Sequence, residues 1–285
     1  MEPVEVMLAK GRPVNSTDPH GAAVTTDEVA SAIAAVRATS PLVHCITNTV
    51  VANFTANVLL AAGAAPAMVN DPAESGVLAG VAGALLINLG TVTSAQAEGM
   101  DVAIGAAVAA GVPWVMDPVA IGALPLRTDL ARSWARRSPA VIRGNASEIG
   151  ALAGGLGGRG VDSTASPEEV AQTARTLAAE LGTVVAVSGP VDYITDGHRT
   201  ARVDAGHPLL TRVTGVGCSL GALIGAAVAA SGDPFVGAVA GTALVCVAGD
   251  LAAADHTGPG SFAVALLDRM SDVRPEDVAA RAGLR

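Results

Sequence analysis

Residues 213–222 read Val213-Thr214-Gly215-Val216-Gly217-Cys218-Ser219-Leu220-Gly221-Ala222, a glycine turn that runs into an apolar, alanine-rich segment. That segment is predicted to be a helix over residues 219–231. Gly215 and Gly217 have no Cβ atom, so the backbone can bend sharply and come close to a ligand. The first N–H groups of a helix lack an internal partner, and the helix dipole adds positive potential. The turn therefore predicts an anion site, typically for phosphate, although glycines also serve plain close packing.

Short apolar segments alternate with helical segments on the N-terminal side of this turn. Such an alternation is typical of a parallel sheet covered by helices on both faces, so the predicted fold class is a three-layer α/β sandwich. A hairpin over 192–203 is expected at the edge of the sheet, and helices over 234–254 and 260–271 are expected after the turn. The expected strands are 41–46, 65–69, 84–89, 112–117, 140–143 and 183–188, and the other helices are 26–38, 50–61, 94–110, 128–137, 145–153 and 167–181.

The chain is expected to form one domain. It has 285 residues, and no break in composition divides residues 24–285. Residues 1–23 contain three prolines and no periodic apolar pattern, so they are expected to be a mobile N-terminal extension. Residues 154–166 are expected to be a glycine-rich loop.

Composition limits the partners of the protein. A formal charge of −9 argues against nucleic acid, whose phosphates require basic patches, but allows ATP. The three cysteines are widely spaced and fit a reducing cytoplasm better than a disulfide scaffold. The uncharged stretches 76–97 and 213–232 are long enough to cross a bilayer, yet they contain glycine turns and polar residues, so no membrane span is expected. These features predict a soluble, cytoplasmic protein.

Polar residues follow several of the expected strands. In an open α/β sheet, ligands bind beyond the carboxyl ends of the strands, where such residues converge. Two carboxylates can hold a hydrated Mg²⁺, an arginine fork binds phosphate oxygens, and the glycine turn offers N–H donors to a transferring phosphoryl group. Together they predict phosphoryl transfer without a Walker motif, because no GxxxxGK[ST] sequence is present. The residues are Asn48, Asn70, Asn88, Asp117, Arg143, Glu148 and Ser188.

Two of these positions also have a purely structural interpretation. Asp117 follows an apolar strand directly, where an aspartate often caps a helix or closes a turn. Asn145-Ala146-Ser147-Glu148 has the form of a capping box, with an asparagine at the cap and a glutamate three residues later. Both interpretations stay open at this point.

Six motifs, in matching order over residues 25–271, resemble the hydroxyethylthiazole kinase family, which belongs to the ribokinase-like superfamily and acts in thiamine salvage. The resemblance implies a ribokinase-like fold and ATP-dependent, Mg²⁺-requiring phosphorylation of the primary hydroxyl of 4-methyl-5-(2-hydroxyethyl)thiazole. It also implies a homotrimer with substrate near the subunit interfaces. The motifs are Pro41-Leu-Val-His-Cys-Ile-Thr-Asn48, Phe54-Thr-Ala-Asn57 with Gly63-Ala-Ala-Pro-Ala-Met68, Asp117-Pro-Val-Ala-Ile-Gly-Ala123, Arg143-Gly-Asn-Ala-Ser-Glu148, Ser188-Gly-Pro-Val-Asp-Tyr193 and Thr257-Gly-Pro-Gly-Ser-Phe262.

The resemblance also implies roles for individual residues. Met68 resembles the family's thiazole-contacting methionine, and Asn48 lies in the same pocket-forming segment. Gly215 resembles a substrate-contacting glycine. The remaining roles are triphosphate binding by Arg143, ATP contact by Ser188, Mg²⁺ binding by Asp117 and Glu148, and catalysis by Cys218 together with the turn glycines Gly215 and Gly217.

Cys218 stands where most ribokinase-like enzymes carry a general-base aspartate. A helix N-terminus stabilises a thiolate, so we expect the pKa of this thiol to be lowered. A largely dissociative transition state needs little help from a base, so we expect Cys218 to be a weak or optional one. Positioning and charge stabilisation are expected to dominate.

The chain departs from the family pattern at two positions. Val216 replaces the hydroxyl residue usual in the turn, so one side-chain contact is lost while the backbone donors remain. Ser188 replaces the usual threonine and keeps its hydroxyl.

Three other functions are compatible with parts of the sequence. One is a kinase of another vitamin-related alcohol such as hydroxymethylpyrimidine. The second is a Cys–His hydrolase with Cys218 as nucleophile and His44 or His256 as base. The third is a non-catalytic, trimer-forming ligand-binding relative, against which the two carboxylates argue.

Overall fold

One sheet organises the protein, whose structure is a computed structural model describing residues 24–155 and 166–285. The strands follow the order β2-β1-β3-β4-β5-β6-β7-β8; β1 to β6 are parallel, and β7 and β8 are antiparallel. The mostly parallel sheet predicted from the sequence is thus confirmed. The strands are β1 (Leu42–Ile46), β2 (Ala65–Ala67), β3 (Ala84–Asn88), β4 (Trp114–Asp117), β5 (Val141–Asn145), β6 (Val184–Ser188), β7 (Asp192–Thr195) and β8 (Thr200–Val203).

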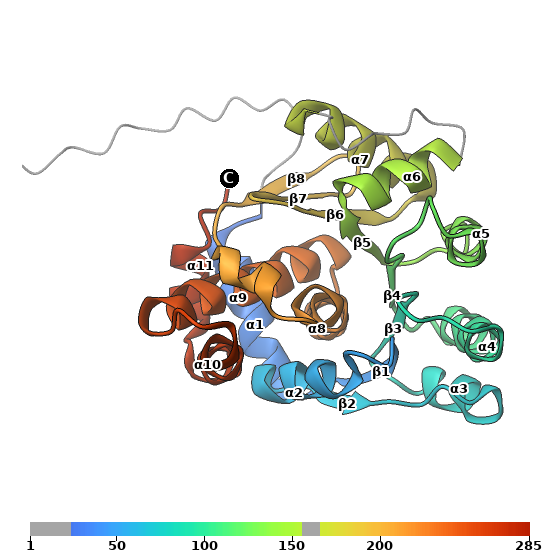
Figure 1. Cartoon of the computed structure of the whole chain (residues 1–285), viewed down its shortest axis with the longest axis horizontal. Coiled ribbons are helices and arrows are strands. Elements are labelled where there is room, and N and C mark those ends of the chain that lie inside the picture. The colour runs from blue at the N-terminus through green and yellow to red at the C-terminus, as the bar shows by residue number, and fades with distance from the viewer. Residues whose placement is uncertain (1–23, 156–165) are drawn as a thin grey trace, which may run out of the picture.

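Helices cover both faces of this sheet, which curves around α8 (Figure 1). One apolar cluster joins the sheet to α1 (Thr26–Thr39), α2 (Ala52–Ala62), α8 (Val216–Ser231), α9 (Pro234–Asp255), α10 (Pro259–Asp272) and α11 (Pro275–Arg281). A second cluster joins the other face to α3 (Pro72–Ala79), α4 (Ser94–Ala110), α5 (Pro125–Trp134), α6 (Ala146–Gly155) and α7 (Pro167–Leu181). The three layers therefore match the predicted sandwich.

The central strands are apolar on both sides because each side faces a helix layer. In β3, Leu86 belongs to the first cluster, whereas Leu85 and Ile87 belong to the second. Side chains alternate between the faces of a strand, so a strand buried on both faces becomes a continuous apolar run.

Helix α8 lies unusually close to the sheet because glycines line its contact face. A Cβ atom at Gly221 would come within 2.9 Å of Leu86 Cδ1, and one at Gly225 within 3.3 Å of Ala84 Cβ. The close approach sets the N-terminus of α8 directly beside the carboxyl ends of β3 and β4. The same glycine-rich stretch thus provides both the close packing of α8 and the turn at which an anion site is predicted.

The apolar stretches that suggested membrane spans are core elements. Residues 76–97 are divided among α3, β3 and α4, and residues 213–232 contain the buried helix α8. Helix α9 is also long and apolar enough to cross a bilayer, but 89% of its most apolar window is buried inside the protein. A buried core helix explains its composition.

Several element boundaries differ from the prediction. Helix α5 was expected over 128–137 but begins at Pro125, a residue that fits the first turn of a helix because its missing N–H is not needed there. Helix α8 begins three residues earlier than expected, and Pro208–Arg212 forms a short 3₁₀ helix (η1) that was not predicted. The expected N-terminal extension and most of the expected loop over 154–166 lie outside the described residues.

Candidate active site

The predicted strand-end residues converge, except Asn70, which is exposed after the edge strand β2. Neighbouring strands bring them to one edge, where Asn88 and Asp117 are register partners in β3 and β4, and Asn145 and Ser188 are partners in β5 and β6. The N-terminus of α8 lies at the same edge, because a Cβ atom at Gly217 would come within 3.3 Å of Arg143 Nη2. We call this group the carboxyl-edge cluster; it comprises Asn48, Asn88, Asp117, Arg143, Glu148, Ser188 and residues 215–218.

Two amides link Cys218 to Asp117 within the cluster. Asn48 Nδ2 donates to Cys218 Sγ at 3.4 Å and to Asn88 Oδ1 at 2.9 Å. Asn88 Nδ2 then donates to Asp117 Oδ2 at 2.8 Å. The N–H of Gly90 donates to Asn88 Oδ1 at 3.0 Å, which fixes the orientation of the Asn88 amide.

Asp117 keeps one carboxylate oxygen free. Its Oδ2 accepts from Asn88 and lies 3.7 Å from Arg143 Nη1, whereas its Oδ1 is buried and has no hydrogen-bond partner within the described residues. Burial raises the pKa of Asp117 to about 7; the charge of Arg143 limits the rise, and Glu148 adds to it. An orphaned buried carboxylate oxygen is a place where a cation would replace the missing partner.

Glu148 forms the capping box that the sequence allowed. Its Oε2 accepts the N–H of Asn145 at 2.8 Å, and its own N–H donates to Asn145 Oδ1 at 3.0 Å. Its Oε1 accepts the N–H of Ala120 at 2.8 Å, which ties the loop after β4 to the start of α6. Each carboxylate oxygen has two lone pairs, so these bonds leave acceptor capacity for a further ligand.

The donor set fits a hydrated Mg²⁺. No group of three or more His, Cys, Asp or Glu side chains in residues 24–155 and 166–285 is arranged to hold a metal ion. Magnesium keeps several of its waters and needs only one or two protein carboxylates. Asp117 and Glu148 are close enough to affect each other electrostatically, and they supply that number.

Arg143 faces the helix N-terminus. Its Nη2 donates to Ser188 Oγ at 2.8 Å, and its Nε is buried without a hydrogen-bond partner in the described part of the chain. Gly215, with φ 101°, forms the N-cap of α8 in a conformation that favours glycine. The N–H of Ser219 is the first to bond back into the helix, to Gly215 O. The N–H groups of residues 216–218 are therefore free to bind an anion between α8 and Arg143.

The expectation that the pKa of Cys218 is lowered is wrong. Burial raises the pKa of this thiol and the Asp117 carboxylate raises it further, whereas the amides of Asn88 and Asn48 and the charge of Arg143 lower it only in part. The helix N-terminus was the only neighbour visible in the sequence, and Asp117 comes from a strand 101 residues earlier in the chain. Cys218 is therefore a protonated thiol at neutral pH.

Met68 lies three strands away from Asp117, although β2 pairs directly with β1, the strand that leads to Asn48. It follows the edge strand β2, which β1 and β3 separate from Asp117 on β4. Three strand spacings correspond to about 14 Å. Its side chain is 38% exposed, and buried His44 holds the adjacent backbone through a 2.6 Å hydrogen bond between Nε2 and Val69 O.

The other sequence interpretations are resolved by these contacts. Val216 is buried in the first apolar cluster, so its side chain packs inward rather than toward the anion site. Cys45 and Cys246 are buried. Among the described residues, the hydrogen-bond partner of Cys218 is Asn48 and no histidine, so the geometry gives no support to a Cys–His hydrolase.

Two contacts of the site were not predicted from the sequence. Asn88 was noted only as a polar residue at a strand end, and Asp192 only as the start of the hairpin. In the structure Asn88 orients Asp117, and Asp192 lies beneath the loop that carries Ser188. Their roles depend on strand order, which the sequence does not give.

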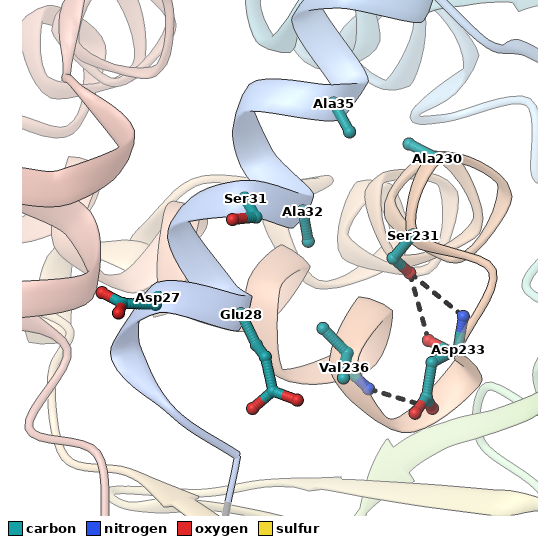
Figure 2. Close-up of a pocket in the computed structure, with 9 residues that line it drawn as sticks. All are labelled: Asp27, Glu28, Ser31, Ala32, Ala35, Ala230, Ser231, Asp233 and Val236. Carbon is teal, nitrogen blue, oxygen red and sulfur yellow. Dashed lines mark hydrogen bonds between the residues drawn. The ribbon is translucent and has the colours of Figure 1, made fainter.

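A separate hollow lies at the opposite end of α8, about 22 Å along the helix from its N-terminus. Figure 2 shows its lining from α1, the end of α8 and the start of α9, with Asp233 capping α9. Two of its three acidic side chains have structural partners, because Glu28 forms a capping box with Thr25 and Asp233 pairs with Arg199 at 2.7 Å. The hollow is not part of the carboxyl-edge cluster.

Comparisons with known proteins point to one family. The Hydroxyethylthiazole kinase family profile matches residues 33–276. A hydroxyethylthiazole kinase of Clavibacter sepedonicus is 56% identical over 245 residues, covering 86% of this chain and 89% of that protein. The solved structure of a hydroxyethylthiazole kinase protein from Pyrococcus horikoshii OT3 is 39% identical with a TM-score of 0.85, covering 91% of this chain and 98% of that one. Pyridoxal kinase from Staphylococcus aureus, in complex with ADP, is 17% identical with a TM-score of 0.58 over 73% of this chain and 87% of that one, and it shares the fold alone.

Proposed function

Since the chain belongs to the hydroxyethylthiazole kinase family and has its phosphotransferase activity in the thiamine pathway, we propose that the carboxyl-edge cluster is where the transfer takes place. The reaction moves the γ-phosphoryl group of ATP to the primary hydroxyl of 4-methyl-5-(2-hydroxyethyl)thiazole. The observation that carries this placement is the meeting of Asp117, Arg143 and the free N–H groups of α8 at one edge of the sheet.

Asp117 and Glu148 hold Mg²⁺ in this proposal. The unpartnered Oδ1 of Asp117 supports it, because Asn88 occupies Oδ2 and so leaves Oδ1 as the oxygen for a metal. When bound, Mg²⁺ neutralises the charge of the phosphate oxygens. The ion would also favour the ionised form of Asp117, which burial otherwise disfavours.

Arg143 and Ser188 bind the polyphosphate of ATP. The hydrogen bond from Arg143 Nη2 to Ser188 Oγ sets both groups side by side, and the guanidinium faces the α8 N-terminus. The N–H groups of residues 216–218 then donate to the oxygens of the transferring phosphoryl group. These donors are held in place before the reaction, so they need no reorganisation as the charge moves.

Cys218 has a secondary role. Its raised pKa makes it a poor base for the substrate hydroxyl, although its thiol lies at the N-terminus of the same helix. Asn48 donates to the sulfur and holds it in position. The transfer depends mainly on positioning and charge stabilisation, because a loose transition state requires little removal of the proton from the substrate hydroxyl.

The thiazole site includes Met68, Asn48 and Gly215 and is completed in a homotrimer. Within one chain Met68 is about 14 Å from the strand that carries Asp117, so one subunit does not close a pocket around both. Exposed large apolar side chains on the helices before and after β2 in the chain support a subunit interface there, since Leu60 of α2 is 60% exposed and Val77 of α3 and Val81 just after it are each 74% exposed.

The cysteines and the net charge of the protein support a proposal on its cellular compartment and its partners. We propose a cytoplasmic enzyme, because all three cysteines are free in the structure. Its net charge of −9 gives no basis for binding nucleic acid.

The substrate class can be tested by product identification. Purified protein is incubated with ATP, Mg²⁺ and either hydroxyethylthiazole or hydroxymethylpyrimidine, and the phosphorylated products are identified by mass. A thiazole phosphate without a comparable pyrimidine phosphate is expected. Preferential phosphorylation of the pyrimidine would contradict the proposed substrate.

A further inference from the structure

A buried carboxylate outside the carboxyl-edge cluster lies beneath its nucleotide side. Asp192 is the first residue of β7, and its side chain is 7% exposed. Its Oδ1 accepts the N–H of Gly189 at 3.1 Å, which closes the loop that follows Ser188. Its Oδ2 accepts from Cys246 Sγ at 3.3 Å, which anchors the loop to the core helix α9.

The electrostatic surroundings of Asp192 connect it to the site. Burial raises the pKa of this carboxyl, whereas the thiol of Cys246, the N–H of Gly189, the charge of Arg143 and the side chain of Ser188 lower it. Arg143 and Ser188 therefore lie near the carboxylate. Arg143 is on β5, with Asp117 on the neighbouring strand β4 and Asp192 two strands away on β7. The loop that Asp192 closes carries Ser188, whose Oγ accepts from Arg143 Nη2, so a hydrogen-bonded path joins Asp192 to Arg143.

A structural role alone does not require a charge at this position. An asparagine oxygen would accept the N–H of Gly189 equally well, without the cost of burying an ionisable group. The charge has a use because Arg143 is itself largely buried and is bonded through Nη2 to Ser188. A second negative charge two strands away adds to the stabilisation of the charged guanidinium at this place.

We propose that Asp192 is a positioning residue for ATP, which fixes the Ser188–Asp192 loop and, by its charge, holds Arg143 where the polyphosphate binds. The proposal rests on the nucleotide role of Arg143 and Ser188 proposed above. Asp192 does not touch the phosphates itself. Its substitution should therefore weaken ATP binding and leave thiazole binding unchanged.

The test compares Asp192→Asn with wild type and with Asp196→Asn. Asp196 is a matched control, because its Oδ1 accepts two backbone N–H groups in the turn of the same hairpin and its Oδ2 pairs with Arg199, away from the cluster. We expect Asp192→Asn to raise KM for ATP by about 10-fold, with KM for the thiazole unchanged. Asp196→Asn should keep both KM values. A wild-type KM for ATP in Asp192→Asn would overturn the inference.

A double-mutant cycle separates a charge effect from a loop defect. Asp192→Asn and Arg143→Lys are measured singly and together; coupled residues give a combined rise in KM for ATP well below the product of the single effects. A combined rise in KM for ATP that equals the product of the two single effects would overturn the inference. Should Asp192→Asn not fold, Asp192→Ser also keeps an acceptor for Gly189 and removes the charge, and it makes the same comparison.

Arg143→Ala distinguishes a failure of the proposed nucleotide site from a failure of the proposed role of Asp192. A wild-type KM for ATP in Arg143→Ala contradicts the proposed nucleotide site itself. A raised KM in Arg143→Ala beside a wild-type KM in Asp192→Asn contradicts only the role of Asp192.

Discussion

Single contacts decide which groups in the carboxyl-edge cluster are free to react. Asn88 donates to one oxygen of Asp117, and the other oxygen has no hydrogen-bond partner among the residues that the structure describes. The same amide accepts from Asn48, whose other contact is Cys218. The candidate metal ligand and the candidate base are thus fixed by one chain of hydrogen bonds.

Cys218 should contribute little to turnover. Its raised pKa means that only a small fraction is thiolate at neutral pH, so Cys218→Ser is expected to lower kcat by less than about 10-fold. Steady-state kinetics with the thiazole measures this directly. Loss of nearly all turnover in a folded Cys218→Ser variant would show that the thiol is an essential base.

Buried His44 should make the protein less stable in mild acid. Burial lowers the pKa of His44, and the hydrogen bond to Val69 offsets this only in part. The unfolded chain, with a histidine pKa of about 6.5, then binds the proton more readily than the native state. The contribution to stability is therefore complete above about pH 6.5 and is lost as the pH falls below that value.

Denaturant unfolding between pH 7 and pH 5 tests this sign. His44→Gln keeps a donor for Val69 and removes the titration, so it should lose less stability than wild type over that range. The exposed His198→Gln variant is the control. Equal losses in His44→Gln and wild type would contradict the prediction.

For individual residues, the types of side chain at the site could be predicted from the sequence, but not all of their contacts and pKa shifts. Asp117, Arg143 and Glu148 could be proposed because they follow apolar strands directly. The pKa of Cys218 was predicted in the wrong direction, because its main electrostatic neighbour comes from a distant strand. The part played by Asp192 could not be foreseen, since it depends on β7 lying two strands from Arg143.

Among the elements, α8 connects the core to the site. Gly221 and Gly225 let it approach β3 and β4, and Gly215 and Gly217 leave its first turn open. The sequence identified this turn and the helix after it. The first residues of the helix were not predicted, because Val216 and Gly217 have poor helix propensity. In the structure, tertiary packing overrides this propensity.

Gly217→Ala tests the close approach of α8 to Arg143. The added Cβ would lie 3.3 Å from Arg143 Nη2, so the guanidinium must shift and KM for ATP should rise about 3- to 10-fold. Alanine favours a helix, so thermal stability should not fall. Gly105→Ala on α4, whose Cβ would lie 3.4 Å from Arg137 Nη2, is a matched control with an unchanged KM. Wild-type KM in both variants would contradict the placement of the polyphosphate beside Gly217.

On the scale of the whole molecule, the fold class follows from the alternation of apolar strands and helices, but the strand order does not. The order β2-β1-β3 carries Met68 away from Asp117, and this separation makes a subunit contact part of the proposed thiazole site. Sequence periodicity contains no information on such an arrangement. The homotrimer came only from the resemblance to a family.

Charges on the exposed faces of α2 and α3 should disrupt the assembly. Leu60→Glu combined with Val77→Glu puts two carboxylates on the proposed interface, so light scattering is expected to show smaller particles than for wild type, and KM for the thiazole should rise. Val264→Glu on α10, at a side chain that is 64% exposed, is the control. An unchanged mass and KM in the double variant would contradict this interface.

The most direct test of the carboxyl-edge cluster as the place of phosphoryl transfer is to measure thiazole-dependent ADP release by Asp117→Asn across a Mg²⁺ titration. Wild type and Asp101→Asn are measured beside it. Asp101 is a matched surface aspartate, 60% exposed and paired with Arg137. Asparagine keeps the size of Asp117 but removes the charge that binds the metal, so kcat should fall by about 100-fold or more, while Asp101→Asn behaves as wild type. Wild-type turnover and Mg²⁺ dependence in a folded Asp117→Asn variant would contradict the assignment of this edge of the sheet as the place of phosphoryl transfer.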